Sequence, residues 1–482
     1  MSLERASSGI AGLDEILCGG YLPGRSYLIS GPPGTGKTTL GWHFLQTGAQ
    51  AGERALFLSF GEAENELREN AERSGFSTEG IDVVDLSPSS DLFAQLQTYD
   101  IFSASEVERE PTTRLIVEAI GRIEPRRVFV DSMTSLRYLA TDYHEFRRQA
   151  LSFVRYLVGQ GSVMLMTSET SADHPDDDLR FLADGVIELA LDSRARTIRV
   201  TKLRGSDFRS GLHTLRLTAE GAVVFPRLVP ERHVAAYPDS QLSSGLPAVD
   251  ALLDGGIERG TVTLVTGPTG VGKTTLGMQF VSALAQNGHR SAVYTFDERA
   301  ETLLRRCESI GIHARAMVEA GTLRVTEVEA LRYGPDEFAN LVRTDVEEKG
   351  TQIVMIDSVA GYQVSVAGDD LVERLHAISR YLENMGVTVL LINELQDIMS
   401  FRVSDTGLSY LADNVIFLRY IERVGNGRSE LTRAIGVLKK RLSGFETTLR
   451  EFRIGPTGLD VGEPMAGLFR PIMERELISD SR

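Results

Sequence analysis

Residues 31–38 read GPPGTGKT and residues 267–274 read GPTGVGKT. Both stretches fit the pattern GxxxxGK followed by Ser or Thr, in which a glycine-rich loop leaves a strand, cradles phosphates and opens a helix. Each follows an apolar run, SYLIS at 26–30 and TVTLVT at 261–266. One match alone is compatible with an ordinary glycine-rich turn before a helix. Two matches in the same context instead predict two phosphate-binding loops.

The residues of these loops have separate expected roles. Glycines let successive backbone N–H groups curl around phosphates, and the helix N-terminus adds a favourable dipole. Lys37 and Lys273 would reach the β- and γ-phosphates of ATP, while the hydroxyls of Thr38 and Thr274 would hold Mg²⁺. The predicted ATP-binding residues are Gly34, Thr35, Gly36, Lys37, Thr38 and Thr39 in the first loop and Gly270, Val271, Gly272, Lys273, Thr274 and Thr275 in the second.

The whole chain is a tandem duplication, because matching segments recur in the same order. SGIAGLDEILCGGYLPG at 8–24 pairs with SGLPAVDALLDGGIERG at 244–260, and the two loops keep the same spacing from these segments. The stretch 226–243 contains three prolines and lacks periodicity, which is typical of a linker. We expect a first domain at 1–228, a linker at 229–243, a second domain at 244–455 and a C-terminal tail at 456–482.

Short apolar runs alternate with amphipathic stretches in both halves. Examples are ALFLSF and ENELRENAERSGF in the first half, and IVMIDS and LVERLHAISRYLENMG in the second. This alternation predicts a mainly parallel sheet flanked by helices, built twice. The expected fold class is therefore α/β.

Two aspartates end matching apolar runs, Asp131 in VFVDS and Asp357 in VMIDS. A carboxylate at the C-terminal edge of a parallel sheet can join the magnesium shell of a bound nucleotide. Ordinary strand-ending aspartates are the alternative, although their matched distance from a phosphate-binding loop favours the Mg²⁺ role.

Two glutamates, Glu62 and Glu298, end the strands that follow the two loop helices. Hydrolysis needs a carboxylate to orient or deprotonate the attacking water, so both are candidate catalytic residues. Gly61 precedes the first and Asp297 the second, so the second copy offers two carboxylates. A solvated acidic loop remains the alternative.

Composition excludes several classes of protein. The 482 residues carry a net charge of −16, which opposes binding to nucleic acid or anionic membranes. The two cysteines cannot form a disulfide framework, and no apolar run approaches the roughly 20 residues of a membrane helix. The N-terminus MSLERASSG lacks the apolar core of a signal peptide. We expect a cytoplasmic protein.

Two copies that each open with SG(I/L)xxxD and close with a K-x-R element resemble the KaiC family of circadian clock ATPases and autokinases. The resemblance implies tandem RecA-like domains, ATP and Mg²⁺ as cofactors, and a double-ring homohexamer with ATP bound between subunits. It also implies that basic residues reach into the neighbouring subunit's nucleotide. The stretches that match are Lys202, Leu203 and Arg204 in the first copy, of which Lys202 and Arg204 are basic, and Lys439, Lys440 and Arg441 in the second. A solvated basic turn is the alternative.

The family assigns different chemistry to its two rings. Glu62 and the residue before it match a pair that assists slow hydrolysis, but Gly61 departs from the usual paired glutamates. Asp297 and Glu298 match a pair that supports phosphoryl transfer onto the protein itself, and Asp297 is also a candidate metal ligand. Its side chain is shorter than the usual glutamate.

The family's adjacent phosphoacceptors, a Ser followed by a Thr, fall on Ser409 and Tyr410. The first copy has Arg180 and Phe181 at the matching places, so an aromatic recurs and Tyr410 is interpreted as a packing residue. Ser409 is therefore the favoured phosphoacceptor, Ser404 is a weaker candidate, and an ordinary loop serine is the alternative.

The last residues, from 455 onward, show no clear match to the family segment that receives KaiA. We therefore expect no KaiA-type control, and a KaiB-like protein on the first ring is the favoured partner. Two other functions stay open. One is a DNA-dependent recombinase or helicase motor on the same fold, which the acidic charge opposes. The other is a nucleotide-gated scaffold without autokinase activity.

Overall fold

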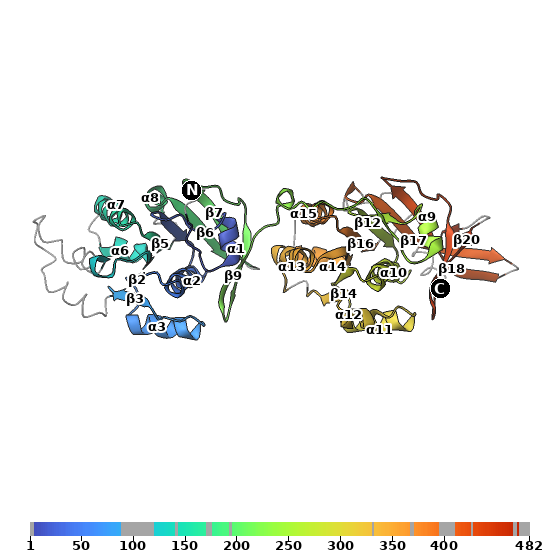
Figure 1. The fold of residues 1–482 in the computed structure, drawn as a ribbon, viewed down its shortest axis with the longest axis horizontal. Coiled ribbons are helices and arrows are strands. Elements are labelled where there is room, and N and C mark those ends of the chain that lie inside the picture. The colour runs from blue at the N-terminus through green and yellow to red at the C-terminus, as the bar shows by residue number, and fades with distance from the viewer. Residues whose placement is uncertain are drawn as a thin grey trace, which may run out of the picture. The chain divides into compact units, whose positions relative to one another are not determined.

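The computed structural model describes residues 4–87, 120–139, 143–169, 176–191, 195–329, 332–366, 371–394, 410–425, 428–465 and 470–471. The chain divides into two compact units, Met1–Arg227 and Leu228–Arg482 (Figure 1). Among the described residues, no helix is long and apolar enough to cross a membrane.

The first unit is built on one sheet in the order β3-β2-β4-β5-β1-β6-β7-β8-β9. The strands from β3 to β6 are parallel, whereas β6 to β9 pair antiparallel. The strands are β1 (Ser26–Ser30), β2 (Ala55–Ser59), β3 (Ile81–Asp85), β4 (Arg127–Asp131), β5 (Val163–Ser168), β6 (Gly185–Leu191), β7 (Arg196–Leu203), β8 (His213–Thr218) and β9 (Gly221–Phe225).

Helices cover both faces of this sheet because its central strands are apolar on both sides. On one face, Tyr27 and Ile29 of β1 pack with residues of α1 (Ala11–Ile16), α2 (Lys37–Gln50) and α3 (Glu64–Arg73). On the other, Leu28 packs with residues of α7 (Tyr143–Gly159) and α8 (Asp177–Leu182), near α6 (Met133–Leu139). Figure 1 shows these two helical layers on either side of the sheet.

The second unit repeats this plan with the sheet order β14-β13-β15-β16-β12-β17-β18-β19-β20, and β21 pairs with β17. Its strands are β12 (Val262–Gly267), β13 (Arg290–Thr295), β14 (Leu323–Glu327), β15 (Thr351–Asp357), β16 (Thr388–Glu394), β17 (Asn414–Gly425), β18 (Arg428–Lys440), β19 (Arg450–Gly455), β20 (Gly458–Pro464) and β21 (Arg470–Pro471). Its helices are α9 (Pro247–Leu252), α10 (Lys273–Gln286), α11 (Ala300–Ser309), α12 (Ala314–Glu319), α13 (Pro335–Glu347), α14 (Val359–Val366) and α15 (Leu371–Asn384).

The predicted tandem α/β fold is confirmed, with three additions. Each sheet continues into antiparallel strands beyond its parallel part. The segment expected as a linker holds the 3₁₀ turn Pro230–Arg232 and β10 (Gln241–Leu242), and β10 pairs with β11 (Ile257–Glu258). Asn384 donates to the Pro230 carbonyl at 3.0 Å, so this segment lies against the second unit. The second sheet also extends past residue 455, because β20 pairs with β19.

Candidate functional site

Both phosphate-binding loops connect a central strand to the N-terminus of a long helix. The loop residues Gly36 and Gly272 precede α2 and α10 with φ of 102° and 112°, a left-handed conformation that glycine accepts without strain. A Cβ at Gly36 would lie 2.9 Å from Leu217 Cδ2, and one at Gly272 would lie 3.0 Å from Phe452 Cε1. The backbone conformation thus favours glycine at both positions, a Cβ would also press on these side chains, and a helix N-terminus faces each loop. This donor set fits nucleotide phosphates.

The loop lysines are held at their own loops. Lys37 Nζ donates to the carbonyls of Gly31 at 2.7 Å and Pro32 at 3.0 Å. Lys273 Nζ donates to the two matching carbonyls of its loop, each at 2.9 Å. Because these acceptors are neutral, the hydrogen bonds hold both ammonium groups in place without pairing them with an opposite charge.

Burial lowers the pKa of both lysines, and neighbouring carboxylates oppose that effect. Glu169 is the strongest opposing group at Lys37, followed by Asp131. Glu394 has the same effect on Lys273. These two glutamates follow or end β5 and β16, the strands that pair with β1 and β12. Neither glutamate is among the residues predicted from the sequence, although each closes a matching apolar run, VMLMTSE and VTVLLINE.

The first predicted magnesium site has its hydroxyl and carboxylate in contact. Thr38 Oγ1 donates to Asp131 Oδ2 at 2.6 Å, and Thr167 Oγ1 donates to Asp131 Oδ1 at 2.5 Å. Hydroxyl and carboxylate oxygens are suitable Mg²⁺ ligands beside substrate phosphates. The residues present therefore fit a magnesium ion that arrives with a nucleotide.

The second site differs in the hydrogen-bond donors that its aspartate has. Asp357 accepts a hydrogen bond from Thr274, and burial raises the pKa of Asp357 despite that bond. Ile392 lies opposite Asp357 on the neighbouring strand, where the first unit has the hydroxyl of Thr167. The same ligand pair is therefore present, but without a hydroxyl donor from the neighbouring strand.

The candidate catalytic glutamates occupy equivalent turns at the ends of β2 and β13. Ser59 Oγ donates to the carbonyl of Glu62 at 2.6 Å, and Thr295 Oγ1 donates to that of Glu298 at 2.7 Å. Asp297 accepts a hydrogen bond from Ser358, the residue after Asp357. The second unit thus brings Asp297 beside the predicted metal ligand.

The first K-x-R element lies at the edge of the sheet opposite its own loop. Leu203 pairs with Gly185 at the start of β6, whereas the loop leaves β1 beyond Ser30, which pairs with Glu188. Lys202 Nζ donates to the carbonyls of Arg180 at 2.7 Å and Phe181 at 3.2 Å. This placement separates Lys202 from the loop of its own unit.

Its companion Arg204 lies 3.9 Å from the carboxylate of Asp184, and Leu203 is half-buried against the core. Asp184 also accepts from the backbone N–H of Ser26 at 3.2 Å, so it is fixed to the central strand β1. An anchored carboxylate therefore lies beside the guanidinium.

The second element repeats this arrangement. Lys439 Nζ donates to the Ala412 carbonyl at 2.5 Å, and Arg441 pairs with Asp413 at 2.8 Å. Lys440 differs, because its ammonium is buried and lies 3.0 Å from Glu258 within the unit. Successive strand residues point to opposite faces, so only one of the adjacent lysines can face outward. The Lys440 side chain therefore does not join the outward basic pair.

The predicted phosphoacceptor Ser409 and the weaker candidate Ser404 lie outside the described residues. Tyr410 is 58% exposed and its repeat equivalent Phe181 is 66% exposed. Neither aromatic is a core residue of its own unit, which differs from the packing role expected for Tyr410. Lys202 of the first K-x-R element donates to the Phe181 carbonyl, whereas Lys439 donates to the carbonyl of Ala412, two residues after Tyr410.

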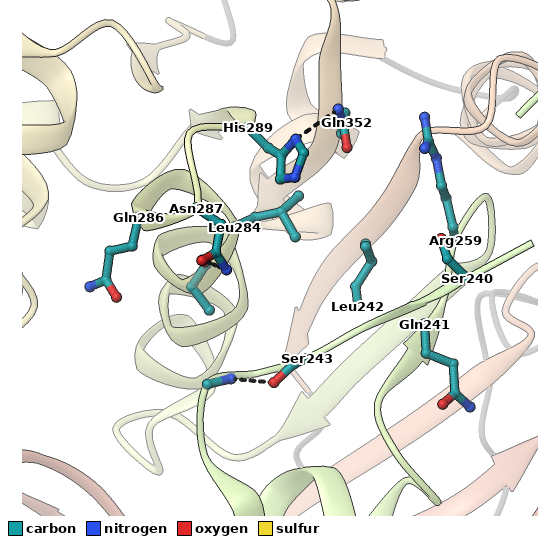
Figure 2. A pocket seen from close by; sticks show the side chains of 12 residues that line it. Ser240, Gln241, Leu242, Ser243, Arg259, Leu284, Gln286, Asn287, His289 and Gln352 are labelled. Atoms are coloured by element: carbon teal, nitrogen blue, oxygen red, sulfur yellow. Dashed lines mark hydrogen bonds between the residues drawn. The ribbon is translucent and has the colours of Figure 1, made fainter. Parts of the chain in front are cut away.

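A separate pocket of about 420 Å³ lies in the second unit (Figure 2). It is lined by β10 and the end of α10, and His289 and Gln352 contact each other there at 3.1 Å. The helix α10 begins at the loop lysine and ends at Gln286, about 20 Å further along. This pocket is distinct from the phosphate-binding edge and contains none of the predicted site residues.

Comparisons with known proteins agree with this geometry. A family model described as "ATPase: KaiC" matches residues 6–229 and 242–466. The chain is 27% identical to the circadian clock oscillator protein KaiC of Prochlorococcus marinus strain MIT 9313, over 98% of this chain and 95% of that protein. It is 28% identical to KaiC of Synechococcus elongatus, covering 98% and 91%, and 27% identical to the circadian clock protein KaiC3 of Synechocystis, covering 96% and 92%.

Proposed function

The chain belongs to the KaiC family of ATPases, and we propose that it hydrolyses ATP as a homohexamer and phosphorylates its own Ser409 in the second unit. One observation carries the proposal. Each unit places a glycine-rich loop, a loop lysine, a Thr–Asp pair and a glutamate in the turn after a strand at the same edge of the parallel part of its sheet. Because both units contain all four of these features, we propose two nucleotide sites in one chain.

In each site the protein positions groups and supplies charge. Bound Mg²⁺-ATP would supply the γ-phosphoryl group and the positive charge of the metal. Lys37 and Lys273 would neutralise phosphate charge, while the Thr38–Asp131 and Thr274–Asp357 pairs would hold the magnesium ion. These contacts fix the nucleotide relative to the strand-ending glutamates.

Glu62 and Glu298 orient the attacking nucleophile, which is water in hydrolysis and a hydroxyl in phosphoryl transfer. In the second unit, the carboxylate of Asp297 lies beside this position and adds a second acceptor. We propose that this carboxylate pair assists removal of a proton from the Ser409 hydroxyl of an adjacent subunit.

The position of the K-x-R elements supports an assembly with nucleotide between subunits. Lys202 with Arg204, and Lys439 with Arg441, lie at the sheet edge opposite their own loops. Cations that cannot reach their own nucleotide can neutralise charge on a neighbour's γ-phosphate, as arginine fingers do. We therefore propose these four side chains, and not that of Lys440, as the contacts in trans.

The exposed aromatics support the same contact surface. Phe181 and Tyr410 are matching aromatics of the two units and both are exposed, and aromatic residues are enriched in subunit interfaces. We further propose a KaiB-like partner on the first unit and no KaiA-type or nucleic-acid partner. The net charge of −16 opposes the DNA-dependent motor.

Incubation of the full chain with γ-labelled ATP and Mg²⁺ tests the autokinase. Wild type should incorporate label at Ser409, as located by phosphopeptide mapping, and both Ser409→Ala and Lys273→Ala should lose it. Ser404→Ala is the matched control, because it removes a nearby hydroxyl that is not the proposed acceptor. Native mass measurement with ATP should give six chains. Absence of label with stable ATP binding would instead support the nucleotide-gated scaffold.

A further inference from the structure

The backbones of the two candidate catalytic glutamates make the same hydrogen bonds. The N–H of Glu62 donates to Ser59 Oγ at 3.2 Å, and the N–H of Glu298 donates to Thr295 Oγ1 at 3.3 Å. In both turns the same hydroxyl donates back to the glutamate's carbonyl. A difference between the two sites must therefore come from the side chains around each carboxylate.

The residue that contacts each carboxylate differs between the units. Arg306 Nη2 of α11 lies 2.9 Å from Glu298 Oε2 in an ion pair. The equivalent residue of α3 is Asn70, whose Nδ2 reaches Glu62 Oε2 only at 3.5 Å, the outer limit of a hydrogen bond. The second glutamate is therefore held by a full charge and the first by a weak neutral donor.

The charge of Arg306 extends into the second nucleotide site. Burial raises the pKa of Asp357, the predicted metal ligand, and the positive charge of Arg306 acts in the opposite direction. Arg306 is 41% exposed and Glu298 is 24% exposed, so water still reaches the pair. The pair can thus open, and its contribution is expected to be modest because exposed ion pairs are weak.

We infer that Arg306 is a positioning residue that restrains Glu298 and makes the second unit a slower hydrolase than the first. A carboxylate oxygen engaged by a guanidinium accepts more weakly from an attacking water, and it must leave the ion pair to orient that water. This slows loss of the γ-phosphoryl group to water and keeps it available for another acceptor. The inference rests on the proposed function, since it takes Glu298 as the water-orienting group.

Steady-state phosphate release by full-length chains tests the inference. In a Lys37→Ala background, which leaves only the second site active, Arg306→Asn should raise kcat by roughly three- to fivefold, the most that opening an exposed ion pair provides. KM should stay the same, because Arg306 contacts the glutamate and not the nucleotide. Arg306→Lys should retain the wild-type rate by restoring the pair.

The reciprocal exchange and a matched control use the same helices. In a Lys273→Ala background, Asn70→Arg should lower kcat of the first site by a similar factor. Arg305→Asn removes the neighbouring charge on α11, which is 77% exposed and lies 4.0 Å from Glu301, and should leave kcat unchanged.

Two results would overturn the inference. One is a fall in kcat for Arg306→Asn, which would make Arg306 a cation that assists the reaction. The other is an equal rate for Arg306→Asn and Arg305→Asn. Failure of the proposed function is separate: Glu298→Gln would then leave phosphate release in the Lys37→Ala background unchanged.

Discussion

Replacement of Gly31 by alanine should destabilise the first unit strongly, because the loop's first glycine is packed against backbone. A Cβ at this position would overlap the carbonyl oxygen of Leu189 in β6 and lie 3.1 Å from its Cβ. A carbonyl in a central strand cannot move aside by changing rotamer. The expected cost is about 3 kcal/mol, the upper part of the range for overpacked sites.

Gly52→Ala is the matched control in the same unit. Gly52 has φ of 78°, and a Cβ there would meet no atom within 4 Å. Its cost is the left-handed strain of about 1–2 kcal/mol, partly offset by about 0.4–1 kcal/mol from a less flexible unfolded chain. The net cost is therefore about 1 kcal/mol.

Urea unfolding followed by tryptophan fluorescence measures the first unit alone. The chain has one tryptophan, Trp42, which is 3% exposed in α2 and packs 5.0 Å from the ring of Phe57. With an m-value of about 3 kcal/mol/M, Gly31→Ala should lower the midpoint by about 1 M and Gly52→Ala by about 0.3 M. A midpoint shift for Gly31→Ala no larger than that of Gly52→Ala would refute the packing argument.

Three further predictions concern single groups. Burial raises the pKa of Cys307 from 9.0 to about 11, so in a Cys18→Ser variant at pH 8 its thiol should react with DTNB about 100-fold more slowly than an ordinary thiol; equal rates in native and urea-unfolded protein would contradict this. Burial also raises the pKa of Asp357, so without nucleotide the folded state loses stability as pH rises through that value. Asp357→Asn should therefore raise the melting temperature at pH 7 by roughly 2–4 °C and lose stabilisation by Mg²⁺-ATP, with the difference shrinking toward pH 4; a lower melting temperature at pH 7 would contradict it. A Cβ at Gly61 would meet nothing within 4 Å, so Gly61→Glu should raise first-site phosphate release in a Lys273→Ala background, by less than the roughly 10²-fold of a complete general base; an unchanged rate would count against a second carboxylate there.

The parts of the fold that depend on local pattern were predictable. The loop glycines specify a left-handed turn before a helix, and both Gly36 and Gly272 adopt it. Continuous apolar runs predicted the parallel strands. The antiparallel strands β7–β9 escaped prediction because they lack a continuous apolar run: in RTIRVTKL at 196–203, buried Ile198 and Val200 alternate with exposed residues.

Parts of the site that depend on neighbours across the sheet were not predicted. Glu169 and Glu394 act on the loop lysines because β5 and β16 lie beside the strands that lead into the loops. The order of strands in a sheet cannot be predicted from local sequence. The inward turn of Lys440 follows from strand alternation, but its partner Glu258 is distant in the chain. The repeats place Arg306 where the first copy has Asn70, but the contact of Arg306 with Glu298 depends on how α11 packs against the turn after β13.

The central claim is that ATP turnover comes from both phosphate-binding loops. Phosphate release by wild type, Lys37→Ala, Lys273→Ala and the double variant tests it most directly. Each single variant should retain part of the activity, and the double variant should fall by at least about 10²-fold, the scale for losing a key charge contact. A double variant that hydrolyses ATP at the wild-type rate would contradict the account.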